Sequence, residues 1–145
     1  MSFIPITPSK FANRIVLGYP DRAINSCKDR NTLESYFEVL CHGTRPNASG
    51  ETFAYVLDDS TMQGSTIDAP LLAAIIYSHR AYHGQPIRLL MCWAGYGENS
   101  LAQQIADLLQ TSVVACDRPI DTDYFLPDIP EGRWLFFWPR PTYDD

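Results

Sequence analysis

The order of the apolar segments in the middle of the chain is the strongest constraint on its fold. A β-branched and aromatic run covers residues 35–41, and a helical pattern with a cap at Asp68 leads to a second strand-like run at 87–92. Another helical stripe, capped by Asn99 or Ser100, leads to a third strand-like run at 112–116. Strands that alternate with helices form parallel sheets with right-handed crossovers. We therefore predict an α/β fold with a small, mainly parallel sheet and helices on both faces.

Shorter segments complete the expected fold. Residues 14–17 and 53–57 are predicted to form short strands, and the polar stretch 18–34 a loop or a short helix. The apolar spacing after Asp68, followed by Gly84 and Pro86, predicts that this helix closes at about His83. The aromatic run 134–138 is expected to be a last strand that is buried on both faces, whereas partial exposure at an edge would indicate a partner surface.

Length and charge limit the number of domains and the classes of partner. The 145 residues predict one domain spanning 1–145. A net charge of −6 argues against binding to nucleic acid or to an anionic membrane, because both are negatively charged. The longest nearly apolar run, 69–77, is far shorter than the roughly 20 residues of a membrane-spanning helix, and no Sec signal is visible. We expect a cytoplasmic protein, or one delivered into a target cell by a non-Sec secretion system.

Four cysteines are present, and their spacing argues against a zinc finger or ribbon. None of them forms a CxxC motif, and most lie in or beside apolar runs. We therefore expect reduced, mostly buried thiols, as in a cytosolic protein. The four residues are Cys27, Cys41, Cys92 and Cys116.

Two residues capable of catalysis follow predicted neighbouring strands. His42 ends one strand-like run and Cys92 ends another, and ligands of open parallel sheets bind beyond these carboxyl ends. An imidazole beside a thiol can promote formation of the nucleophilic thiolate. Glycines after both positions let a substrate approach and leave amide N–H groups free for an oxyanion. Taken singly, a buried structural cysteine and a His-Gly turn are the commoner interpretations, but their joint placement favours a dyad.

The segments around both residues resemble a known family. Val39-Leu40-Cys41-His42-Gly43, followed 50 residues later by Leu89-Leu90-Met91-Cys92-Trp93-Ala94-Gly95, resembles the caspase-like (clan CD) cysteine peptidases. Residues 84–92, 101–109 and 113–115 are similar to a narrower group, the caspase-like domains of bacterial polymorphic toxins and secreted effectors. The shared pattern is a strand, a Cys-x-x-Gly, an Ala-Gln-x-apolar-Ala helix and a Val-rich strand. The resemblance covers roughly residues 35–116.

This resemblance implies a caspase-like three-layer sandwich and a cysteine endopeptidase of effector or toxin type. Cys92 is then the nucleophile, His42 the general base, and the backbone N–H groups of Gly43 and Cys92 the oxyanion site. It implies no cofactor, a protein or peptide substrate, and a cognate inhibitor or immunity protein as a further partner. An active dyad of this kind needs an exposed Cys92 with a depressed pKa.

Residues near the dyad suggest the pocket and also an alternative. Trp93 and Gly95 follow the cysteine, and Asp117 and Arg118 follow the third strand at the same edge, so all four are candidate pocket residues. Trp93 is bulkier than the residue usual at this position in the resembling domains, and the short chain leaves little room for a substrate groove. The alternative function is therefore a catalytically idle caspase-like domain that binds a protein partner.

A small metal-dependent hydrolase is a second alternative. His79 and His83 are four residues apart, which would place both on one helix face. The metalloprotease pattern needs Glu at position 80, where this chain has Arg80. We therefore expect no metal site.

Overall fold

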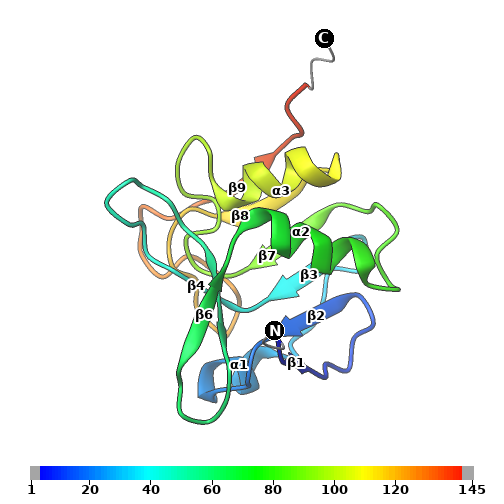
Figure 1. The fold of residues 1–145 in the computed structure, drawn as a ribbon, viewed down its shortest axis with the longest axis vertical. Coiled ribbons are helices and arrows are strands. Elements are labelled where there is room, and N and C mark those ends of the chain that lie inside the picture. Colours follow the sequence, from blue (N-terminus) through cyan, green and yellow to red (C-terminus); the bar gives the residue numbers. More distant parts are fainter. Residues whose placement is uncertain (1–3, 142–145) are drawn as a thin grey trace.

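The computed structural model describes residues 4–141 and confirms a mixed α/β fold (Figure 1). Its main sheet is mixed: four central strands run parallel, and an antiparallel strand flanks them at each edge. The four parallel strands follow the predicted apolar runs. In spatial order the strands are β1 (Ile6–Thr7), β2 (Arg14–Leu17), β3 (Phe37–Leu40), β7 (Ile87–Leu90), β8 (Val113–Cys116) and β9 (Trp134–Phe137).

Helices α2 (Ala69–Ser78) and α3 (Leu101–Leu109) pack beside each other on one face of this sheet (Figure 1). Each begins where a side chain caps the first turn. Asp68 accepts a hydrogen bond from the Leu71 N–H at 3.1 Å, and Ser100 accepts one from the Gln103 N–H at 3.0 Å. None of the helices described in residues 4–141 has the length and apolar character needed to cross a membrane.

The opposite face is covered by the short helix α1 (Arg22–Cys27) and by the loop that follows β8. A second, small sheet contains β4 (His42–Gly43), β5 (Ala54–Leu57) and β6 (Gly64–Ile67). Sequence patterns missed β1, β4 and β6, because two-residue strands and a Gly-Ser-Thr segment carry no apolar alternation. Strand β4 follows β3 after a single residue, so the chain passes from one sheet to the other at Cys41.

Helix α2 ends at Ser78, and the prediction that it extends to about His83 is wrong. The backbone of His79 is extended, with φ −75° and ψ 131°. The rings of His79 and Tyr82 both pack on Phe37 of β3, with ring centroids 5.2 and 5.6 Å away. Covering this buried phenylalanine turns the chain out of the helix. His79 and His83 therefore do not share a helix face, and the geometry assumed for a two-histidine metal site is lost.

Strand β9 lies at the edge of the main sheet, so the expectation of a strand buried on both faces is also wrong. The Phe136 side chain is 62% exposed, and Trp138, just after the strand, is 68% exposed. Phe137 points to the other face and packs against the core. An edge strand has only one neighbour, and here only one of its faces is well covered.

Three charged residues lie in register across the centre of the sheet, on the face that carries α1. Arg14 of β2, Glu38 of β3 and Arg88 of β7 are direct neighbours. The Arg14 Nη2 and Glu38 Oε1 atoms are 2.6 Å apart, and both side chains are fully buried. Arg88 Nη1 lies 2.9 Å from the other Glu38 oxygen. One carboxylate thus compensates two guanidinium groups inside the protein.

We predict that Glu38→Gln lowers the free energy of unfolding by about 3–5 kcal/mol, because it leaves two buried cations without a counter-charge. Urea denaturation of both proteins measures the difference. Asp123→Asn is the matched control, since it removes one partner of the exposed Arg30–Asp123 pair and should cost less than about 1 kcal/mol. Equal losses in the two variants would contradict the importance of the buried charges.

Candidate functional site

The structure brings His42 and Cys92 to the same edge of the main sheet. Strands β3 and β7 are parallel neighbours, and Leu40 of one pairs with Leu90 of the other. His42 and Cys92 each lie two positions beyond this pair, after their strands have ended. This placement follows from the parallel crossover through α2, which the order of the apolar segments predicts.

The backbones of Gly43 and Cys92 touch at this edge. A Cβ atom added to Gly43 would lie 2.0 Å from the Cys92 carbonyl oxygen, so only glycine fits here. The Thr44 N–H donates to the Phe53 carbonyl on the neighbouring segment. Because bonding alternates along an antiparallel pair, the Gly43 N–H faces away from β5. The Cys92 N–H has no acceptor within residues 4–141. Both amides proposed for an oxyanion therefore belong to one close contact.

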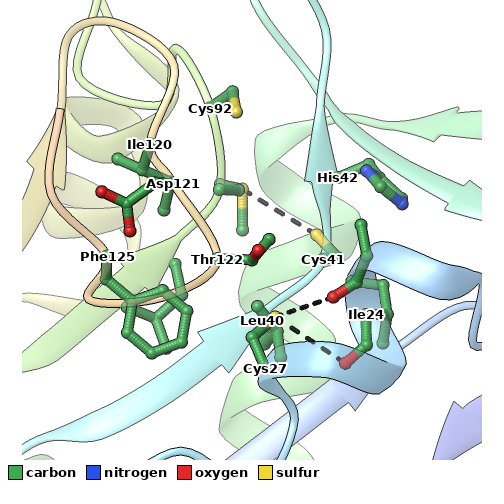
Figure 2. A pocket seen from close by; sticks show the side chains of 13 residues that line it. Ile24, Cys27, Leu40, Cys41, His42, Cys92, Ile120, Asp121, Thr122 and Phe125 are labelled. Carbon is green, nitrogen blue, oxygen red and sulfur yellow. Dashed lines mark hydrogen bonds between the residues drawn. The ribbon is translucent and has the colours of Figure 1, made fainter. Parts of the chain in front are cut away.

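A cavity of about 140 Å³ opens beside these two residues. Figure 2 shows Cys92 on one side, His42 and Cys41 on another, and the loop 120–125 opposite them. Helix α1 and the ends of β3 and β7 form the remaining walls, and most of the lining is apolar. The lining residues are Ala23, Ile24, Cys27, Leu40, Cys41, His42, Leu90, Met91, Cys92, Ile120, Asp121, Thr122 and Phe125.

Asp21 fixes the His42 ring, and the sequence analysis did not identify it. Its Oδ2 atom lies 2.7 Å from His42 Nε2, and the aspartate side chain is largely buried. Because a carboxylate only accepts hydrogen bonds, Nε2 must carry the proton, and Nδ1 is left as an acceptor. The other oxygen of Asp21 caps α1 by accepting from the Ile24 N–H at 2.9 Å. The sequence did hold a signal, because Asp21 lies beyond the carboxyl end of β2, the strand next to β3.

The surroundings of Cys92 favour the neutral form of its thiol. Burial raises its pKa, a hydrogen bond from the Ile120 backbone opposes that rise, and the negative charge of Asp128 adds to it. No hydrogen bond joins Cys92 to His42 among the residues that the structure describes. The exposed thiol of depressed pKa that an active dyad needs is not the arrangement seen here, because the thiol is partly buried and the imidazole is held by Asp21.

The other three cysteines are less accessible than Cys92. All four are free thiols, and Cys27, Cys41 and Cys116 are buried. Burial raises the pKa of Cys27 to about 11 and that of Cys41 to about 12. Cys41 lies against Met91, with their sulfur atoms 3.9 Å apart. Of these thiols, Cys92 is thus the one that a reagent or substrate reaches most easily.

Trp93, Gly95, Asp117 and Arg118 lie next to the cavity but do not line it. The Arg118 guanidinium stacks on the rings of Trp93 and Tyr96, at 5.4 Å from each ring centre. The Gly95 N–H donates to the Cys116 carbonyl at 2.8 Å, and Asp117 accepts from the Arg133 N–H. These contacts fasten the turn after Cys92 to the end of β8. A direct role of the four residues in the pocket stays a prediction.

The backbone of Trp93 adopts an unusual conformation immediately after Cys92. Its φ is +65°, in the left-handed region that residues other than glycine rarely adopt. Non-glycine residues in this region cost free energy and concentrate at functional sites, where surrounding contacts hold them. The stacking of Arg118 on Trp93 supplies such a contact. The turn that presents the Cys92 thiol is therefore held in a strained geometry.

No metal centre is evident in residues 4–141. No three His, Cys, Asp or Glu side chains gather there as they would around a metal ion. The Nδ1 atom of His79 already accepts a hydrogen bond from the Ala81 N–H at 3.1 Å.

Comparison with known proteins adds one finding. A family model described as a domain of unknown function (DUF8616) matches residues 16–124, which include Asp21, His42, Cys92 and nearly all the residues lining the cavity. No curated protein and no solved structure matches the chain. Because the matched region covers about three-quarters of the sequence, the chain belongs to the DUF8616 family.

Proposed function

We propose that this protein is a cysteine peptidase that cleaves a peptide bond through Cys92 and His42. The observation that carries the proposal is the close contact between Gly43 and Cys92, which brings a thiol, an imidazole and two backbone amides to one cavity. A nucleophile, a base and oxyanion donors within reach of one another are the parts that acyl transfer requires.

In the first step, the Cys92 Sγ atom attacks the carbonyl carbon of the substrate. Because the thiol is neutral at rest, its proton passes to the Nδ1 atom of His42 as the new S–C bond forms. The carbonyl oxygen becomes an oxyanion that the N–H groups of Gly43 and Cys92 stabilise. The ring of His42 must approach the thiol for this transfer, and hydrogen bonds of this kind often tighten only when substrate binds.

In the second step, the peptide C–N bond breaks and the His42 imidazolium gives its proton to the leaving amine. The acyl group remains on Cys92 as a thioester. A water molecule then attacks the thioester, loses a proton to His42, and expels the Cys92 sulfur, which takes the proton back. Asp21 acts as a positioning residue, because its bond to Nε2 holds the tautomer that leaves Nδ1 free.

The resemblance to caspase-like peptidases supplies the finer parts of the proposal. On this interpretation the fold is a caspase-like three-layer sandwich with a mainly parallel sheet and helices on both faces. The protein is then an effector or toxin of the bacterial type, acts on a protein or peptide, and meets a cognate inhibitor. It works in the cytoplasm or reaches a target cell by a non-Sec route.

A catalytically idle domain that binds a protein partner is the second candidate. The raised pKa of Cys92 and the engagement of His42 by Asp21 favour it, because neither residue is poised for reaction in this structure. In that case the two residues serve only to pack the sheet edge, and removing the imidazole leaves the reactivity of the thiol unchanged.

Thiol alkylation tests the two candidates. We predict that iodoacetamide modifies Cys92 faster than Cys27, Cys41 or Cys116, and that the rate still rises above pH 9, because burial raises the pKa of this thiol. At pH 7, His42→Ala should slow the reaction at Cys92 about tenfold or more, since general-base assistance is lost. Mass spectrometry of timed digests gives the rate at each cysteine.

His83→Ala is the control, because His83 is exposed and lies outside the cavity. Equal Cys92 rates in wild type and His42→Ala, with folding intact by circular dichroism, would support the idle domain and reject the dyad.

Asp21→Asn separates positioning from helix capping. Asparagine can still cap α1 through Oδ1, but the Nδ2 group that replaces Oδ2 only donates and cannot accept from His42 Nε2, so the base is left in the wrong tautomer. We predict a fall of roughly 10²-fold in the rate of Cys92 acylation by a peptide thioester, with little loss of stability. Stopped-time mass spectrometry measures the acylated fraction.

Asp68→Asn is the matched control, because Asp68 caps α2 in the same way, whereas His42 bonds to Asp21. A similar slowing in both variants would show that capping, and not the bond to His42, explains the effect.

A further inference from the structure

We propose that the 140 Å³ cavity is the specificity pocket of this peptidase and that it selects an apolar side chain of leucine to phenylalanine size immediately before the cleaved bond. This inference rests on the proposed function. It adds a substrate class that neither the dyad nor the family match defines.

The position of the cavity supports this assignment. The carbonyl carbon that Cys92 attacks is bonded directly to the Cα atom of the residue before the cleaved bond. The side chain of that residue is therefore attached to the atom next to the carbon under attack. Cys92 and His42 both line the cavity, which lies between α1 and the loop 120–125 (Figure 2). A side chain of the acyl residue therefore has this cavity as its nearest enclosed space.

The size of the cavity sets the size of the side chain. An apolar protein cavity of about 150 Å³ is large enough to hold a benzene molecule. A cavity of about 140 Å³ therefore accepts the isobutyl group of leucine, the thioether of methionine or the ring of phenylalanine. A glycine residue leaves it empty.

The chemistry of the walls selects against charge. Ile24, Leu40, Leu90 and Phe125 are buried apolar side chains, and no lysine or arginine lines the cavity. An acidic side chain would enter without a counter-charge, at a large desolvation cost.

The one carboxylate in the lining is already engaged. Asp121 Oδ1 accepts hydrogen bonds from the N–H groups of Asp123 and Tyr124, at 3.0 and 2.7 Å. These bonds turn the loop and are made to the backbone, so they persist whether or not a ligand is present. Only the Oδ2 atom of Asp121 remains for a basic side chain, whose charge would otherwise be buried among apolar walls.

Peptidyl acyloxymethyl ketones with identical leading residues and different final residues test the proposal. The final residue is Leu, Met, Phe, Ala, Asp or Lys, and mass spectrometry follows alkylation of Cys92. We expect the Leu, Met and Phe probes to react about 10- to 200-fold faster than the Ala probe, and the Asp and Lys probes to be slowest. Cys92→Ala must abolish the labelling.

The outcomes separate this inference from the proposed function. Equal labelling by all six probes, slowed by His42→Ala, would reject the specificity pocket and keep the peptidase. Faster labelling by the Asp or Lys probe would also reject the apolar pocket. Failure of all peptidyl probes, while iodoacetamide still modifies Cys92, would reject the peptidase and this inference together.

A variant that fills the cavity gives a second test. Ala23 lines the cavity from α1 and is only partly buried, so Ala23→Leu can occupy the space without disturbing the core. We expect the ratio of Leu-probe to Ala-probe rates to fall at least about tenfold. Ala74→Leu is the matched control, because Ala74 is an exposed helical alanine of α2 outside the cavity. An unchanged ratio in Ala23→Leu would contradict the pocket assignment.

Discussion

The buried Glu38 carboxylate holds together the parts of the protein that form the site. It compensates Arg14 and Arg88 in the middle of the sheet, and both arginines contact the loop that lines the cavity through Phe125. Arg14 donates to the carbonyl groups of Lys28 and Asn31 in the segment that follows α1. The guanidinium groups of Arg14 and Arg88 both lie 5.6 Å from the ring centre of Phe125, in the opposite wall. Burying these charges is costly, and the hydrogen bonds of Arg14 to Glu38 and to backbone carbonyl groups offset that cost.

The same row of charges explains why the cavity lies where it does. Side chains alternate between the faces of a sheet, so Leu40 and Leu90 follow Glu38 and Arg88 on the same face. These two leucines form part of the cavity lining. The catalytic candidates come two residues later, beyond the ends of the strands. Along these two neighbouring strands, the buried charged residues therefore come first, the leucines that line the cavity come next, and His42 and Cys92 come last.

The site combines a held imidazole with a partly buried thiol of raised pKa. Asp21 keeps the His42 ring in one tautomer, while burial keeps the proton on Cys92. In the proposed mechanism, proton transfer therefore accompanies attack, in contrast to sites that hold a thiolate–imidazolium pair at rest. The left-handed backbone of Trp93, held by stacking with Arg118, fixes the turn on which the thiol is carried. The proposed mechanism is compatible with this geometry: the Cys92 thiol is protected without substrate, and it reacts when substrate binding brings His42 closer.

Local patterns in the sequence determined the central strands, the two long helices and the common edge for His42 and Cys92. Apolar periodicity and capping residues act within a few positions, and a parallel crossover places the ends of β3 and β7 together. The end of α2 could not be read in this way, because His79 leaves the helix to pack on Phe37, some 40 residues earlier in the chain.

Only the tertiary structure decided how the candidate site is completed. Asp21 meets His42 across 21 residues, and the loop 120–125 closes the cavity opposite α1, on the same face of the sheet. Neither segment has a periodic apolar pattern, so local sequence does not predict the contacts they make. The pKa of Cys92 likewise depends on burial by residues distant in the chain. The sequence by itself determined which reactive groups share an edge, whereas long-range packing decided their partners, their protonation and the shape of the cavity between them.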